Sequence, residues 1–236
     1  MVGPVLAEPE VCSPQRCVSH AVMIRFPFLL LAALLALPLR AQAFDLSGVD
    51  PATVRFLAEH GELIVVEEHP NGRLRMVTAG VVIPLSPDRI WDVITDYDAY
   101  PEWVPEMEET RVINQTDRHV DVAFRLVILA AVVSKSVDYT LRIIENPKRS
   151  TRWFLLDGDF AAARGSWQLL PLDEGTSTLA FYSTYTDMAS LGWVVETLLE
   201  ARPDMEYAMQ TSAAVMMVKS LKGRLADPAV SGPNGD

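Results

Sequence analysis

Apolar and polar residues alternate through the middle of the chain with the period of a β-strand. Val120, Val122 and Phe124 would share one face of a strand, while Asp121 and Arg125 would share the other. Since successive side chains of a strand point to opposite faces, this alternation indicates an antiparallel sheet with one dry and one wet face. Similar runs, separated by turn residues, predict strands over residues 62–68, 73–83, 109–114, 120–127, 132–144, 151–156, 163–171 and 176–187.

Three helices are expected around these strands. Residues 51–60 follow Asp50, a good N-cap residue, and begin with a proline, which suits the first turn of a helix. A second helix begins at residues 86–88 (SPD), and a long third helix covers residues 204–225, after an apolar segment at 188–202. The sheet must wrap around this last helix, because nothing else in the chain can cover its dry face.

The start of the chain has the pattern of an export signal. Residues 26–37 form an unbroken apolar run, Arg16 and Arg25 precede it, and residues 41–43 (AQA) follow as a small-x-small cleavage site. This pattern predicts a signal peptide over residues 1–43 and a periplasmic or secreted mature protein. An uncleaved anchor or a buried helix is the alternative interpretation.

The predicted leader has two further consequences. Met23 would be a more typical start, in which case residues 1–22 are a misassigned extension. Both cysteines, Cys12 and Cys17, lie within the leader, so the mature chain is expected to have no disulfide and no thiolate metal site.

The net charge of the chain restricts the classes of partner that it can bind. The formal net charge is −11, from 20 Lys and Arg against 31 Asp and Glu. Phosphate contacts need a basic face, so we expect no nucleic-acid partner and no polybasic hold on an anionic membrane. We expect a monomer whose contacts with the membrane or with envelope proteins are transient.

Residues 82–109, with the sequence VIPLSPDRIWDVITDYDAYPEWVPEMEE, resemble the first-helix signature of the START-like superfamily, also called SRPBCC. Residues 165–169 (GSWQL) and 175–176 (GT) are similar to a later hairpin of that superfamily. Residues 100–105 (YPEWVP) look most like its polyketide cyclase/dehydrase and coenzyme-Q-binding branch. The resemblance implies an α+β, START-like helix-grip fold, in which a curved antiparallel sheet wraps around a long C-terminal helix.

This resemblance also suggests how the chain is divided. Residues 44–72 would supply an N-terminal helix and a first strand that lead into the domain, and residues 73–226 would form the START-like domain. Residues 227–236, rich in Pro, Gly and Asn, would form a flexible tail.

The mature sequence has no recognisable catalytic or metal-binding motif. His60, His69 and His119 lack the paired spacing that places two ligands on one helix face. Residues 165–166 (GS) do not form a nucleophile elbow. Residues 157–159 (DGD) favour a tight turn, with a carboxylate pair or a weak calcium site as the alternative. We therefore expect no metal and no cofactor, and we favour a binding protein over an enzyme.

A ligand cavity is expected between the sheet and the last helix. Strand parity and helical spacing give the expected ligand-binding residues, which are Tyr139, Trp167, Phe181, Ser183, Tyr185, Met209 and Met216. Met209 and Met216 lie two helical turns apart, so both can face the sheet, and their flexible thioethers suit varied apolar partners. The alternative is a filled core whose hydroxyl groups bond to the backbone.

Residues 126–133 (LVILAAVV) are the most apolar stretch of the mature chain. Both strand faces are dry there, so this hairpin tip must either be buried under residues 188–202 or meet something apolar outside. We expect the two segments to form a gate, and its expected residues are Leu126, Ile128, Val133, Leu191 and Trp193.

Three functions are compatible with these patterns. The first is an exported START-like domain that binds and carries a lipid or other apolar small molecule by desolvating it. The second is an enzyme of the aromatase/cyclase type, and the third is a non-catalytic module that binds an envelope protein. The first is favoured, because aromatase/cyclase substrates are tethered to cytoplasmic carriers, which conflicts with an export signal.

Overall fold

The computed structural model describes residues 50–130 and 133–227. The predicted signal peptide and nearly all of the predicted tail lie outside these residues. In chain order the elements are α1 (Pro51–His60), β1 (Leu63–Glu68), β2 (Leu74–Ile83), α2 (Pro87–Thr95), η2 (Tyr97–Ala99), α3 (Tyr100–Trp103), β3 (Met107–Gln115), β4 (Val120–Ala130), β5 (Val133–Asn146), β6 (Ser150–Gly158), β7 (Ala163–Leu172), η3 (Asp173–Gly175), β8 (Ser177–Thr186), η4 (Met188–Leu191), α4 (Trp193–Ala201) and α5 (Asp204–Ala226).

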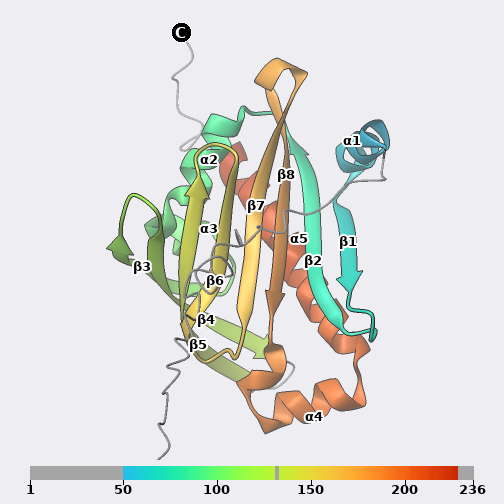
Figure 1. Cartoon of the computed structure of the whole chain (residues 1–236), viewed down its shortest axis with the longest axis vertical. Coiled ribbons are helices and arrows are strands. Elements are labelled where there is room, and N and C mark those ends of the chain that lie inside the picture. Colours follow the sequence, from blue (N-terminus) through green and yellow to red (C-terminus); the bar gives the residue numbers. More distant parts are fainter. Residues whose placement is uncertain (1–49, 131–132, 228–236) are drawn as a thin grey trace, which may run out of the picture. The chain divides into compact units, whose positions relative to one another are not determined.

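The strands form one curved antiparallel sheet of eight, in the order β1-β2-β8-β7-β6-β5-β4-β3. The sheet is open, because β1 and β3 remain at its two edges. Helix α5, 23 residues long, runs diagonally along one face of this sheet and packs on β2 and β8 (Figure 1). This architecture confirms the α+β, START-like helix-grip fold.

The two faces of the sheet carry different helices, as alternate residues of β8 show. Leu179 and Phe181 pack with Val54 and Ala58 of α1. Ala180 belongs instead to the main core, which includes side chains of α2 and α5. Because neighbouring residues of a strand point to opposite faces, α1 covers the outer face and α5 the inner face.

Local sequence signals explain where the first two helices begin. An Asp50 side-chain oxygen accepts a hydrogen bond of 3.0 Å from the Thr53 backbone N–H, which caps α1. In both α1 and α2 a proline occupies the first helical position, where its missing N–H costs nothing. The helix expected over residues 51–60 is confirmed.

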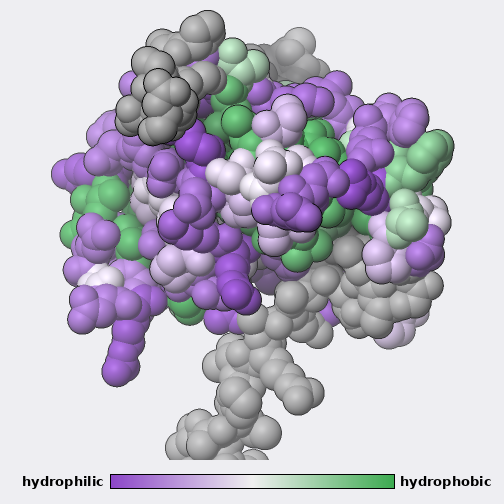
Figure 2. Space-filling view, turned by 90° about the horizontal axis from the view of Figure 1, so that it is seen from above, coloured by the Kyte–Doolittle hydropathy of each residue, from purple (hydrophilic) through white to green (hydrophobic). Residues whose placement is uncertain are grey.

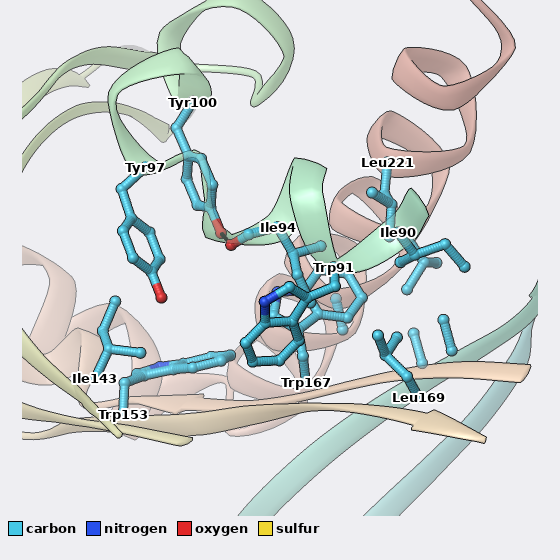
Figure 3. Close-up of a cluster of buried hydrophobic side chains, with 14 of the residues drawn as sticks. Ile90, Trp91, Ile94, Tyr97, Tyr100, Ile143, Trp153, Trp167, Leu169 and Leu221 are labelled. Atoms are coloured by element: carbon cyan, nitrogen blue, oxygen red, sulfur yellow. Dashed lines mark hydrogen bonds between the residues drawn. The ribbon is translucent and has the colours of Figure 1, made fainter. Parts of the chain in front are cut away.

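Helix α2 packs its apolar side onto the inner face of the sheet. Ile90, Trp91 and Ile94 are buried, while Asp88 and Asp92 are exposed, as the helical period predicts. Figure 3 shows these apolar side chains above Trp167 and Leu169 of β7, with α5 alongside. The core thus joins helices and sheet that are distant in sequence.

The region 188–202 differs from the single apolar segment expected. It divides into η4 and α4, separated by Gly192, whose φ of 132° is a conformation that side chains other than glycine rarely adopt. Within the described residues, no helix is both long and apolar enough to cross a membrane. The face that carries the β7–β8 turn is mainly polar, with small groups of apolar residues between (Figure 2).

Candidate ligand cavity

A cavity of about 340 Å³ lies between the inner face of the sheet and helix α5. Its lining comes from strands β4 to β8, the segment from η2 to β3, and the face of α5 that points to the sheet. This volume is near the lower end of the ~300–1,000 Å³ found for small-molecule sites. The sheet and the last helix therefore enclose a space large enough for one compact ligand.

Aromatic rings line the side of the cavity formed by β4 and β5. Phe124 and Tyr139 are cross-strand partners, and their rings stack with centroids 5.2 Å apart. Phe160 meets the Tyr139 ring edge-on at 5.3 Å, and Tyr100 lies 6.3 Å from Phe124. Aromatic pairs at these distances hold each other in place, so this wall is preorganised.

A second aromatic group lines the floor of the cavity on β6, β7 and β8. The Tyr182 ring stacks on Trp153 at 5.4 Å and contacts Trp167 at 4.7 Å. Trp153 and Trp167 are among the labelled side chains of Figure 3, where both lie on the sheet below the side chains of α2 and η2. The floor is therefore formed by contacting aromatic rings.

Helix α5 closes the cavity with a flexible wall. Met209, Gln210, Ala213, Met216 and Met217 line it, at the spacing of one helix face. The methionines can adapt to the shape of a ligand, in contrast to the rigid rings opposite.

Neutral polar groups form a short row on β8. Thr184 and Thr186 line the cavity on the same face as Tyr182. The buried Gln210 donates its side-chain N–H to the Thr186 carbonyl oxygen. This row could orient one polar atom of a ligand that is otherwise apolar.

The tyrosines of the cavity are held in their neutral form. Burial raises the pKa of Tyr182 to about 12, against an ordinary value of 10.0. Burial also raises the pKa of Tyr97, Tyr100 and Tyr139. The Tyr100 hydroxyl donates to the Ile94 carbonyl oxygen at 2.7 Å, and Tyr97 donates to a Glu145 carboxylate oxygen at 2.7 Å. Both groups therefore act as fixed donors.

The cavity opens between the start of β3 and helix α5. Four of its lining residues are exposed, namely Pro105, Glu106, Ala213 and Met216, and we call them the opening. Glu106 has a φ of 65°, and its carbonyl oxygen accepts a hydrogen bond of 2.8 Å from the Val127 N–H. This bond fixes the side of the opening opposite α5.

Four of the seven residues expected at the site line this cavity, namely Tyr139, Trp167, Met209 and Met216. Sequence reasoning did not select Tyr182, Thr184, Thr186 or Gln210. For Gln210 the available signal was its position two helical turns before Met217, which places both residues on one face of α5.

Phe181, Ser183 and Tyr185 share a face of β8, as expected, but it is the outer face and not the cavity face. Phe181 packs beneath α1, and the Ser183 hydroxyl bonds to that of Thr78 at 2.8 Å. The Tyr185 ring lies 4.2 Å from the Arg164 guanidinium. The expectation that this face of β8 lines the cavity is therefore wrong, because α1 gives β8 a second dry face.

Two of the residues expected to form a gate, Ile128 and Leu191, belong to one apolar cluster. Leu126 and Ile128 line the cavity from β4, and Leu191 is buried against Val137 and Phe160. Trp193 is 74% exposed on α4, and the Val133 side chain lies outside the described residues. Of the expected gate, only Leu126 is near the opening, since it pairs with Met107.

Among the described residues, the acidic side chains are not gathered into a candidate metal centre. In the described part of the chain, no group of three or more His, Cys, Asp or Glu side chains could hold a metal ion. Asp157 and Gly158 are the last residues of β6 and pair with Thr140 and Tyr139 of β5, so the tight turn expected at residues 157–159 is replaced by an irregular strand end.

Comparison with known proteins adds a family and a fold. Residues 83–230 match the family described as polyketide cyclase / dehydrase and lipid transport. The ribosome association toxin RatA of Vibrio cholerae is 26% identical over 101 residues, which are 43% of this chain and 67% of that protein. RatA of Escherichia coli K12 is 23% identical over 106 residues, 45% of this chain and 65% of that protein.

Solved structures show the same fold at low identity. A Thermus thermophilus protein superposes with a TM-score of 0.54 at 22% identity, covering 67% of this chain and 100% of that one. A STAR-related lipid transfer protein fragment from Xanthomonas axonopodis superposes with a TM-score of 0.54 at 16% identity. The match covers 71% of this chain and 94% of that one.

Proposed function

Because the chain belongs to the polyketide cyclase / dehydrase and lipid transport family, we propose that it binds and carries a lipid or other apolar small molecule in the cavity under α5. The observation that carries the proposal is the cavity itself, about 340 Å³ in volume and lined by aromatic rings and methionines. The name of the Xanthomonas structure, a lipid transfer protein, is consistent with this function.

Binding would draw its free energy from desolvation. Each methylene group that leaves water contributes about 0.8 kcal/mol. The aromatic walls are already packed against one another, so little ordering is needed when a ligand arrives. The methionines of α5 would adjust to the ligand, and the opening beside Glu106 would admit it.

Cyclase chemistry is the alternative that the family description raises. Such chemistry needs a group that accepts and returns a proton near neutral pH. The buried tyrosines of the cavity have raised pKa values and remain protonated there. We propose a carrier because the described lining is mainly apolar and its one carboxylate, Glu106, lies at the opening.

We further propose that the protein acts in the periplasm or is secreted. The support is the predicted leader, with its apolar run at residues 26–37 and its cleavage site at residues 41–43. N-terminal sequencing of the protein from its native host should find Phe44 first. Retention of residues 1–43 would contradict export.

A protein partner is the second candidate, and a specific surface favours it. On α4, Trp193 is 74% exposed, Val194 50% and Leu198 40%. The relatives named for ribosome association make such a contact worth testing, although the charge of −11 opposes binding to RNA. Substituting Trp193 by Ser should abolish capture of a partner without changing ligand uptake.

Ligand uptake tests the main proposal directly. Native mass spectrometry of gently purified protein should show a co-purifying apolar molecule, and a fluorescent apolar probe should displace it. Ala213→Trp should block the opening and weaken probe binding at least about tenfold. Ala208→Trp places the same bulk on an exposed site of α5 outside the cavity and should change nothing. Equal affinities for the two variants would contradict binding in this cavity.

A further inference from the structure

Apart from one residue at the opening, the described lining of the cavity is electrically neutral. Among its described residues only Glu106, at the opening, is charged at neutral pH, and no Lys, Arg or His lines the cavity. The basic groups nearby are engaged elsewhere. Lys135 donates to the Leu191 carbonyl oxygen at 2.7 Å, and Arg164 lies over Tyr185 on the outer face.

The polar groups within the cavity suit an uncharged oxygen atom. Tyr182, Thr184 and Thr186 present hydroxyl groups from β8, and Gln210 presents an amide from α5. A hydroxyl group is both a donor and an acceptor, so this row can satisfy an alcohol, a ketone or a quinone carbonyl. None of these side chains supplies a full positive charge.

An anionic ligand would meet two penalties at this site. A carboxylate within the cavity would be desolvated without a cationic partner, which is costly for any buried charge. A carboxylate held at the opening would lie beside Glu106 instead, in the field of a chain with a net charge of −11. A neutral ligand of the same size meets neither penalty.

We infer that the cavity selects neutral, largely apolar ligands that carry a hydroxyl or carbonyl group, and rejects the corresponding carboxylic acids in their ionised form. The small volume further favours a single ring system or a single short chain over a lipid with two acyl chains. This inference rests on the proposed function and names the ligand class of the same cavity.

A matched pair of fluorescent probes tests the selection by charge. 1-Pyrenemethanol and 1-pyrenecarboxylate share one ring system and differ in the charge of one substituent. At pH 7 the alcohol should bind at least about tenfold more tightly. Raising the salt concentration should reduce only the part of this difference that comes from exposed charges, so most of it should persist.

A charge introduced into the cavity should reverse the preference. Met209→Lys keeps an unbranched side chain but adds an ammonium group within the lining, and it should raise the affinity for the carboxylate at least about tenfold. Met205→Lys changes the net charge equally outside the lining and serves as the control. Should Met209→Lys not fold, Met216→Lys at the 42% exposed Met216 places the charge at the opening.

The outcomes separate this inference from the proposed function. Binding of the carboxylate as tight as that of the alcohol, or tighter, would overturn the neutral selection while leaving a ligand-binding protein. An unchanged preference in a folded lysine variant would also overturn it. Binding of neither probe would contradict the proposed function, and the neutral selection with it.

Discussion

The indole ring of Trp153 lies directly over the backbone of Gly165, its cross-strand partner in the β6–β7 pair. A Cβ atom at residue 165 would fall inside the contact distance of both that ring and the Ser183 carbonyl oxygen. Figure 3 shows the Trp153 ring lying nearly flat along the sheet. The missing side chain of Gly165 is therefore what allows the ring to form the cavity floor.

Gly165→Ala should destabilise the protein by about 1–3 kcal/mol, because the ring or the strand must move. The ring would be lifted toward the cavity, so the affinity for an apolar probe should fall as well. Urea unfolding followed by tryptophan fluorescence measures the first effect. Gly223→Ala is the control, since a Cβ there meets nothing within 4 Å, and it should stabilise helix α5 by about 1 kcal/mol.

Trp91→Ala should lower the free energy of unfolding by about 3–5 kcal/mol, as for other buried aromatic residues. Trp91 is 9% exposed and packs in the main core between α2 and the sheet. Asp92→Ala alters the next, exposed position of the same helix. It should change the free energy of unfolding by no more than about 0.5 kcal/mol. Similar melting temperatures for the two variants would contradict this packing.

Adjacent residues of β8 should separate stability from binding. Phe181→Ala removes a ring that is 1% exposed beneath α1, so it should cost about 3–5 kcal/mol and leave the probe affinity of the folded protein unchanged. Tyr182→Phe removes only a hydroxyl from the cavity, so it should alter the affinity for a hydroxylated probe with a smaller effect on stability. Denaturant titration and probe titration of both variants check the two faces. A change in probe affinity with Phe181→Ala but not with Tyr182→Phe would mean that the cavity lies on the other face of β8.

An ion pair on the outer face of the sheet should make the free energy of unfolding depend on pH in the acidic range. Arg142 donates two hydrogen bonds to Asp121, of 2.7 and 2.8 Å, and these lower the pKa of that carboxyl to about 2 from an ordinary 3.8. A lowered pKa stabilises the folded state above pH 3.8, and this contribution is lost as the pH falls through about 2. Asp121→Asn should therefore cost about 1–3 kcal/mol at pH 7 and flatten the stability profile between these values.

The matched control for this prediction is the exposed pair of Arg125 and Asp138, whose N–O distance is 2.8 Å. Both side chains are largely in water, so Asp138→Asn should change stability by less than about 1 kcal/mol. Unfolding by urea at several pH values compares the two variants. Equal losses in the free energy of unfolding of the two variants at pH 7 would show that the burial of Asp121 does not strengthen its ion pair.

Much of the fold could be predicted from the sequence because its signals were local. The N-cap and proline of α1 indicated where that helix begins, and the alternation of Val120, Val122 and Phe124 indicated the dry face of β4. These patterns arise wherever one side of an element is buried and the other is solvated. Tyr139 of β5 and Met209 and Met216 of α5 line the cavity as such patterns predicted.

The same reasoning failed on β8 for a physical reason. Both faces of this strand are buried, one by α5 and the other by α1, so Phe181 and Tyr182 are equally apolar in pattern. Which face lines the cavity depends on where α1 packs. This packing is a tertiary contact, which the local sequence pattern does not determine. The opening was likewise unpredictable, since it depends on how the turn at Glu106 approaches α5.

The strand order also determines when the sheet can form during synthesis of the chain. β2 pairs with β8, and the Thr78 and Ser183 hydroxyls that join these strands are 105 positions apart in the chain. Contacts of such separation cost loop-closure entropy before burial repays it, which makes folding slower than for proteins with local contacts. A growing chain exposes the unpaired edge of β2 until β8 has been synthesised. The cavity exists only after that strand and α5 have emerged, so a ligand could enter only a molecule whose sheet and last helix are complete.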